Sequence, residues 1–315
     1  MTCHSCKAAC KRFGRHRNGL QRFRCNQCNK TYTEEHERPL DAMRIPLDRA
    51  LNVLQLLLEG MSIRSVERVT SIHRDTILSL LVLAGERCQN LMHERIKRID
   101  VKDVQVDEIW GYVFKKEGHK WNHEKDIAEI GDAYCFVAVE RDTKLVLTYH
   151  LGKRDTISTD TFIHKLARAT SRNRYQLTSD GFKAYIKAVQ IYLSGRVHFA
   201  QLVKVYGASR EGEQRYSPAE VVDAVPYLVC GNPDRDRICT SHVERQNLSI
   251  RMGMRRMTRL TNGFSKKWEN LQAAYSLWFA YYNFCRKHQT LRVTPAMESG
   301  LTDHVWSIQE LVVPV

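Results

Sequence analysis

The sequence has no long hydrophobic segment: no apolar run in its 315 residues approaches the roughly 18 residues that a membrane-spanning helix needs. Its start, Met-Thr-Cys-His, also lacks the apolar core of a signal peptide. We therefore expect neither a secreted nor a membrane protein, but a cytoplasmic one. Acidic residues are in deficit, with 35 Asp and Glu against 49 Lys and Arg, which gives a formal net charge of +14. This charge favours a polyanionic partner such as nucleic acid, although a basic enzyme without such a partner has the same composition.

The ten cysteines are unevenly distributed, because five of them fall within the first 28 residues and the other five are scattered. A disulfide framework would be spread over the chain, so the clustering favours a metal site in a reducing compartment. Two Cys-x2-Cys pairs are separated by 18 residues, and two such knuckles facing each other complete a tetrahedral zinc site. The predicted zinc ligands are Cys3, Cys6, Cys25 and Cys28. Cys10 lies outside this spacing, and we expect it to be a bystander.

Residues 1–33 carry eight Lys or Arg and no Asp or Glu. A solvated basic face is the ordinary explanation of such a run. In a ribbon held by a metal, however, the guanidinium groups are fixed in place, which favours contact with phosphates. We therefore expect Arg22 and Arg24, which lie between the two knuckles, to bind nucleic acid.

Three helical segments follow the cysteine-rich region. Residues 47–58 repeat leucine at spacings of four, three and four, which predicts one helix. A short helix over 63–69 and a longer one over about 73–90 come next, and this order is typical of a helix-turn-helix. Such motifs read base edges with the start of the longer helix, where this chain has His73, Arg74 and Thr76. A plain helical bundle that joins two domains would show the same pattern.

From about residue 100 the hydrophobic period changes from that of helices to that of strands. The predicted order is strand, strand, strand, helix, strand, helix, strand, which is an α/β architecture and matches the ribonuclease H-like order. The expected strands cover residues 104–110, 134–140, 145–151, 175–179 and 197–205, and the expected helices cover 159–169 and 182–193. Residues 207–240 hold six of the 23 Gly and Pro residues, which indicates an irregular insertion. A final helix over about 265–286 has an apolar stripe that we expect to pack on the sheet.

Three carboxylates are candidates for a metal-dependent active site. Asp107 interrupts an apolar strand, where an uncompensated charge is costly. Asp180 ends a strand at the edge where open α/β sheets place their sites, although strand-to-helix turns often contain such an Asp. Glu244 lies in Ser241-x-x-Glu244, which is also the pattern of a helix capping box. If the three converge, their mutual repulsion calls for divalent cations, and hard oxygen ligands favour Mg²⁺ or Mn²⁺.

The chemistry that such a set supports is phosphoryl transfer, since two ions about 4 Å apart can activate a nucleophile and stabilise a leaving oxygen. The stretch from Arg245 to Lys267 adds seven Lys or Arg and no acid. A basic wall beside an acidic metal pocket suits a phosphodiester substrate.

Three motifs carry a resemblance to a known family: Val-Asp-Glu-Ile-Trp at Asp107, Thr-Ser-Asp-Gly at Asp180, and His-Val-Glu-Arg-Gln-Asn-Leu-Ser-Ile-Arg at Glu244. With the four-cysteine ribbon and the helix-turn-helix, nearly the whole chain resembles the DDE transposases of the insertion-sequence-one family and their relatives. The resemblance implies a ribonuclease H-like mixed five-stranded sheet flanked by helices, Mg²⁺ dependence, and binding to double-stranded DNA at the ends of a mobile element. It also implies a homo-oligomer on DNA, associated with the nucleoid.

Residue roles follow from the same resemblance. It assigns three metal-ligand roles to Asp107, Asp180 and Glu244, and contacts to DNA phosphates to Asn247, Arg251 and Arg255. It divides the chain into a zinc ribbon, a helix-turn-helix domain and a catalytic domain, at residues 1–38, 39–98 and 99–315. Glu244 follows Asp180 by 64 positions, a longer gap than in many DDE enzymes. The alternative third ligands are therefore the acids of the 207–240 insertion, Glu211, Glu213, Glu220 and Asp223.

Two other classes of protein share part of this pattern. A transcriptional regulator could use the N-terminal half for DNA binding and the C-terminal half for dimerisation, but a dimerisation domain has no use for a buried Asp107. A structure-specific nuclease of ribonuclease H type would use the same acids to hydrolyse DNA without joining it. Strand joining separates the transposase from the nuclease, and no residue shows it directly.

Overall fold

The computed structural model describes the chain except residues 17–18, 36–38, 42, 208–220, 260 and 314–315. The contacts between residues divide the chain into two compact units, Met1–Arg44 and Ile45–Val315. The helices of residues 47–95 and the sheet that follows belong to the second unit, whereas the sequence predicted separate domains for them.

The first unit is a small antiparallel ribbon. Its strands are β1 (Cys10–Arg15), β2 (Gln21–Cys25) and β3 (Thr31–Thr33), in the order β1-β2-β3. Its buried side chains with hydrophobic character are few among the described residues: Cys3, Cys25 and Leu40. A core of this size cannot stabilise a fold alone, so the ribbon needs another source of folding energy.

The second unit begins with three helices close to the predicted bounds, α1 (Leu47–Leu58), α2 (Ile63–Thr70) and α3 (Arg74–Arg95). The Ser62 side chain caps α2 by accepting a hydrogen bond from the Ser65 amide at 3.1 Å. Ser71 ends α2 in the left-handed conformation, with φ of 56°, which makes the tight turn before α3.

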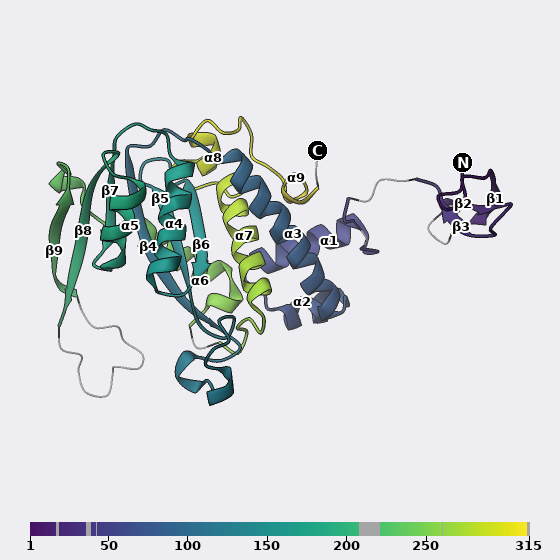
Figure 1. The fold of residues 1–315 in the computed structure, drawn as a ribbon, viewed down its shortest axis with the longest axis horizontal. Coiled ribbons are helices and arrows are strands. Elements are labelled where there is room, and N and C mark those ends of the chain that lie inside the picture. The colour runs from purple at the N-terminus through teal and green to yellow at the C-terminus, as the bar shows by residue number, and fades with distance from the viewer. Residues whose placement is uncertain (17–18, 36–38, 42, 208–220, 260, 314–315) are drawn as a thin grey trace. The chain divides into compact units, whose positions relative to one another are not determined.

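Helix α3 is longer than predicted because its apolar face continues to the end of the helix against α7 (Trp268–Phe284). The two helices approach so closely that a Cβ added to Gly85 would lie 2.5 Å from the Ala273 Cα. Figure 1 shows α7 between the sheet and α3. Helix α7 is therefore buried on nearly all sides, not only along the predicted stripe.

The sheet is mixed and has six strands in the order β6-β5-β4-β7-β8-β9 (Figure 1). Its strands are β4 (Asp103–Val113), β5 (Gly131–Glu140), β6 (Val146–Gly152), β7 (Tyr175–Asp180), β8 (Val197–Tyr206) and β9 (Val221–Cys230). Strand β4 pairs antiparallel with β5 and parallel with β7, and β7 pairs parallel with β8. The outer pairs β5–β6 and β8–β9 are antiparallel.

The prediction of five strands and an irregular 207–240 insertion was wrong for residues 221–230, which form β9. Apolar residues there pair with β8 as the edge of the sheet. Pro226, which helped to suggest irregular structure, sits opposite Leu202 on this edge strand, where a missing amide is tolerated. Residues 208–220 lie outside the described part of the chain.

Helices cover both faces of the sheet. On one face, Phe136 of β5 packs on Phe162 of α4 (Thr156–Ala169) and on Tyr185 of α5 (Ala184–Tyr192). On the other face lie α6 (Ser241–Gly253), which contacts β4 and β5, and α7, which contacts β6. The remaining short helices are α8 (Pro295–Glu298), α9 (Ile308–Val312) and the 3-10 turns Glu117–His119, Asn122–Glu124, Arg235–Arg237 and Arg255–Met257. Among the described helices none is both long and apolar enough to span a membrane.

Candidate active site

The register of two parallel strands brings the first two predicted acids together. Val106 of β4 pairs with Ser179 of β7, so Asp107 and Asp180 follow side by side at the point where β7 ends. Each of Asp107, Glu108 and Asp180 offers a carboxylate oxygen within 4.8 Å of those of the other two. Asp180 also serves its turn, since its Oδ1 accepts a hydrogen bond from the Phe182 amide at 3.0 Å. The turn explanation of Asp180 is thus correct as well, and it leaves the second oxygen for other contacts.

Glu244 reaches the same place from α6. It lines a cavity of about 600 Å³ together with Asp107 and Asp180. The capping-box explanation fails, because the N-cap residue of α6 is Thr240 and no side chain caps the helix. Of the alternative acids, Asp223 is exposed on β9 and does not line the cavity. The other three, Glu211, Glu213 and Glu220, lie outside the described residues.

Burial and mutual repulsion raise the pKa values of the clustered acids. Burial, reinforced by the charge of Asp180, raises the pKa of Asp107 to about 7. Burial and the same neighbour raise the pKa of Glu108 to about 8, and burial raises the pKa of Asp180. One oxygen of Glu108, Oε1, is buried without a hydrogen-bond partner among the described residues. Buried carboxylates that repel one another, one of them with an oxygen that accepts no hydrogen bond, fit the ligand set of a hard divalent cation.

Two basic side chains partly compensate this charge. Arg154, between β6 and α4, lies 3.6 Å from Asp180 Oδ2 and 3.8 Å from Glu108 Oε1. Lys204 of β8 donates to the Glu244 carboxylate. The sequence did not identify either residue, because their approach depends on the loop after β6 and on the register of β8.

Glu108 is also a residue that the sequence analysis missed. Neighbouring side chains in a strand point to opposite faces, so Asp107 and Glu108 are not expected in one cluster. Asp107 indeed contacts α6, whereas Glu108 lies near Arg154 at the start of α4. The consecutive acids in Val-Asp-Glu-Ile-Trp were the available signal, because an apolar strand rarely carries two.

The predicted phosphate contacts on and after α6 have different surroundings. Asn247 Nδ2 donates to Asp107 Oδ2 at 2.8 Å, so this amide holds the Asp107 carboxylate in place. Arg251 donates to the carbonyl oxygens of Met257 and Trp110, at 3.0 and 3.2 Å, and thereby fixes α6 to β4. Arg255 is exposed in the turn Arg255–Met257. Of the three, Arg255 keeps the exposure that a DNA contact needs.

We expect Asn247→Ala to lower any metal-dependent activity by about 10- to 100-fold, the usual cost of losing a residue that orients a metal ligand. The measurement is kcat at saturating substrate over a series of Mg²⁺ concentrations. Asn247→Asp is not a neutral control, because it adds a charge. The matched amide is Gln190→Ala, at an exposed position on α5 that lines neither this cavity nor the cavity between α3 and α4. An unchanged Mg²⁺ dependence in Asn247→Ala would show that the hydrogen bond to Asp107 has no functional role.

We expect Mg²⁺ to raise the thermal midpoint of unfolding, because a ligand that binds only the folded state stabilises it. At about 100 times the dissociation constant the gain in the free energy of unfolding is about 2.7 kcal/mol, which corresponds to about 4–5 °C for a chain of this size. Asp107→Asn with Asp180→Asn removes two ligands and should abolish the shift, whereas Asp223→Asn should retain it. Glu244→Gln and Glu108→Gln, measured in parallel, tell which side chain is the third ligand. Equal shifts in all variants would exclude a metal site at this cavity.

The four predicted zinc ligands form a second cluster, in the N-terminal unit. The sulfur atoms of Cys3 and Cys28 are 3.5 Å apart, and those of Cys6 and Cys25 are 3.4 Å apart. Backbone amides point at the sulfurs, from Ser5 to Cys3 and from Gln27 to Cys25, each at 3.4 Å. These donors suit thiolates, and the Tyr32 hydroxyl, 3.2 Å from Cys3 Sγ, lowers the pKa of Cys3 to about 5. Cys10 lies outside the cluster, in β1 opposite Cys25.

The predicted DNA-contact residues of the N-terminal half are accessible. His73 and Arg74 are exposed at the start of α3, and Thr76 is half-buried. The His73 side chain caps α3 by accepting from the Asp75 amide. In the ribbon, the Arg22 and Arg24 guanidinium groups lie 5.6 and 5.2 Å from the ring centre of Phe13, which holds them on one surface.

No family model and no curated protein matches the sequence. The chain is similar in structure to the piggyBac transposase in a synaptic complex with hairpin DNA, with a TM-score of 0.41, 9% identity, and 88% of this chain and 72% of that chain covered. For the Mos1 transposase in a paired-end complex with the left transposon end the TM-score is 0.20 at 14% identity, over 52% of this chain and 60% of that one. For endonuclease V of Bacillus subtilis the TM-score is 0.21 at 13% identity, over 65% of this chain and 90% of that one. These scores are too low to establish a common fold, so the function proposed below depends on the chain's own residues.

Proposed function

We propose that the chain is a DDE-type DNA transposase, which binds the ends of a mobile element and catalyses Mg²⁺-dependent DNA cleavage and strand transfer. One observation carries the proposal: Asp107, Asp180 and Glu244, from three elements far apart in sequence, line one cavity. The pKa shifts of the two aspartates and the buried oxygen of Glu108 add support, because this charge needs cations. Basic residues around the acids suit a phosphodiester.

The sheet supports a ribonuclease H-like catalytic domain. Numbered in chain order, β4 to β8 lie in the spatial order 3-2-1-4-5, with the first three strands antiparallel and the last two parallel to the first. The ribonuclease H-like order that the sequence resembles has this arrangement, and β9 extends it at one edge. By role, we divide the chain into a zinc ribbon (1–38), a helix-turn-helix (39–98) and a catalytic domain (99–315).

Each residue at the site has a chemical role in this proposal. Asp107, Asp180 and Glu244 hold the cations, with Glu108 as a further oxygen donor. Bound Mg²⁺ ions supply activation of the attacking oxygen and stabilisation of the leaving oxygen. Asn247 orients Asp107. Arg154 and Lys204, which lie beside Asp180 and Glu244, are placed to bind the scissile phosphate. No nucleophilic side chain is required, because water and then a 3′-hydroxyl attack phosphorus.

The N-terminal half supplies the DNA contacts. Zinc held by Cys3, Cys6, Cys25 and Cys28 fixes the ribbon that presents Arg22 and Arg24. The start of α3 presents His73, Arg74 and Thr76 to base edges. Two DNA ends must be handled together in transposition, so we propose that the protein acts as a homo-oligomer on DNA, associated with the nucleoid.

A cleavage assay tests this function. A duplex that carries the terminal sequence flanking the coding region is incubated with the protein and Mg²⁺, and with Ca²⁺ or a chelator in parallel. We expect a nick at the end of the element that depends on Mg²⁺ and on the end sequence. Cleavage that follows DNA structure and ignores the end sequence would favour the nuclease instead, and binding without cleavage would favour the transcriptional regulator.

We expect Arg74→Ala to reduce the discrimination between end sequence and random duplex by about 1–3 kcal/mol, the worth of a bidentate contact to a base. The measurement is the ratio of the two dissociation constants at one salt concentration. Arg64→Ala, at an exposed position on α2, is the matched control. Equal weakening on both duplexes would mean that Arg74 contacts a phosphate and not a base.

A further inference from the structure

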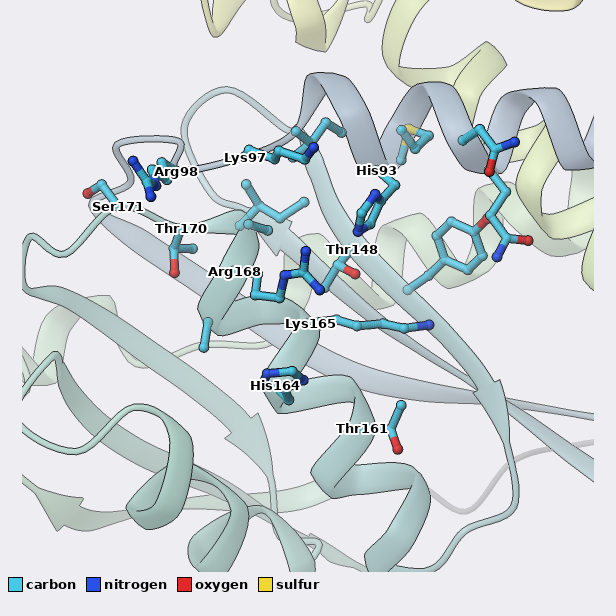
Figure 2. A pocket seen from close by; sticks show the side chains of 18 of the residues that line it. His93, Lys97, Arg98, Thr148, Thr161, His164, Lys165, Arg168, Thr170 and Ser171 are labelled. Carbon is cyan, nitrogen blue, oxygen red and sulfur yellow. The ribbon is translucent and has the colours of Figure 1, made fainter.

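A second cavity, of about 1030 Å³, lies at the β6 edge of the sheet, between α3 and α4 (Figure 2). It shares no lining residue with the acidic cavity. The acids gather near the start of α4, next to Arg154, whereas this cavity includes the end of α4 from Arg168 to Ser171. Its lining runs along α4 from Thr161 to the end of the helix, and only that end, with Arg168, lies about 20 Å from the start of α4. The second cavity is therefore a separate place on the same unit.

Its lining carries positive charge only. Among the described residues that line it there are six Lys or Arg, two His and no Asp or Glu. These basic residues are His93, Lys97, Arg98, His164, Lys165, Arg168, Arg172 and Arg196. Figure 2 shows His93 reaching down from α3, and Lys165 and Arg168 reaching from α4 toward the same space. Such a concentration of like charge within one concave surface is unfavourable unless an anion occupies it.

Helix ends offer a structural explanation for cations here, because both α3 and α4 terminate at this cavity and their last carbonyls attract positive charge. Arg196 fills that role for α4. It donates to the carbonyls of Ala167 and Thr170, at 3.1 and 3.2 Å, and to that of Ser171. The side chains of Lys97, Arg98 and Arg168 make no hydrogen bond or ion pair with the described residues, and all three are exposed. The contacts within the described residues therefore give these three cations no structural role.

Besides its cations, the cavity offers the hydroxyl of Thr148 as a donor at its wall (Figure 2). The hydroxyls of Thr161 and Ser171 also lie at the wall, but they donate to the Ile157 carbonyl at 2.9 Å and to the Asp100 carboxylate at 3.0 Å. Among the described strands, β6 lies at the end of the sheet and pairs with β5. Arginine and lysine with neutral hydroxyl donors are the usual partners of backbone phosphates.

We propose that this cavity binds phosphate groups of a DNA backbone, at a contact separate from the catalytic cavity. The occupant rests on the proposed function, since that function makes DNA the polyanion that the protein meets. A separation of about 20 Å corresponds to about six base-pair steps, so a duplex in the catalytic cavity or a second duplex can reach it.

The test uses two double variants. The cavity variant combines Lys97→Gln and Arg168→Gln, and the control variant combines Lys187→Gln and Arg235→Gln. The control pair is exposed, lies outside the cavity and removes the same charge. Binding of a random duplex to the full chain is measured over a salt series without Mg²⁺. Each lost phosphate contact lowers the slope of log K against log salt by about 0.9, so the cavity variant should lose about 2 and the control nothing. Thermal unfolding of both variants verifies that the fold is kept.

A second arm distinguishes DNA from a small phosphate ligand, using calorimetry with inorganic phosphate and with adenosine monophosphate. Equal slopes in wild type and both variants would overturn the proposal. A different result would be equal slopes in all three proteins, with phosphate binding lost only in the cavity variant. This result would overturn DNA as the occupant and would assign the site to a free phosphate compound. Because the slopes are measured without cleavage, a protein that shows the expected slopes but never cuts DNA would refute the transposase and leave this site standing.

Discussion

Asp107→Asn is expected to abolish both cleavage and strand joining, with a loss of about 10³-fold or more, while binding to end DNA stays nearly intact. The substitution keeps the shape of the side chain and its partner Asn247, but it removes a charge that holds the cations. Metal assistance contributes several kcal/mol of transition-state stabilisation, which corresponds to a rate loss of this size. Rates of nicking and joining, and affinity for the end duplex in Ca²⁺, are the quantities to measure.

The same result is expected for Asp180→Asn, since both aspartates contribute to the cluster. Asp223→Asn is the matched control, because it removes an equal charge from an exposed position on β9 outside the cavity. It should keep full activity. Full activity in Asp107→Asn would remove the two-aspartate site from the account and leave the proposed chemistry without a centre.

Cys25→Ser together with Cys28→Ser is expected to eliminate zinc binding and unfold residues 1–44. The ribbon buries too little apolar surface to fold alone, whereas a four-cysteine zinc site contributes on the order of 10–16 kcal/mol. The full-length protein should contain about one zinc ion per chain, and the variant about none. Rapid proteolysis of the first 44 residues, with the rest of the chain resistant, would report the loss of the ribbon.

Cys10→Ser provides the control, since Cys10 lies outside the cluster and should leave the zinc content unchanged. Zinc retained at full stoichiometry after loss of Cys25 and Cys28 would contradict the ligand set. Retention only in the presence of Cys10 or a nearby histidine would change one ligand and keep the site.

The parts of the fold that depend on short-range patterns were predictable. The leucine spacing of residues 47–58 and the Ser62 cap led to the observed bounds of α1 and the start of α2. Asp107 and Asp180 were identifiable because a charge in an apolar strand and an acid at a strand end are conspicuous in the sequence.

The parts that depend on register and on long-range pairing were not predictable. Strand β9 is stabilised by its antiparallel pairing with β8, and a local pattern of Gly and Pro does not indicate such a pairing. Arg154 and Lys204 lie beside the acids because of the path of the loop between β6 and α4 and the register of β8, which are set by long-range contacts. Arg251 looked free in sequence, but two carbonyls from Met257 and Trp110 take up its guanidinium group. The basic cavity takes its lining residues from α3, β6 and α4, among other segments. Its charged residues are therefore separated in the sequence and do not form a recognisable basic run.

Strand joining is the measurement that tests the central claim most directly. Purified protein is incubated with Mg²⁺, a labelled duplex that carries the end of the element, and unlabelled plasmid as the target, and products are separated on a denaturing gel. The account predicts labelled end DNA joined covalently to plasmid through its 3′-hydroxyl, absent with Asp107→Asn and present with Asp223→Asn. End-specific nicking that never yields joined product, under conditions where the nicked 3′-hydroxyl accumulates, would contradict a transposase.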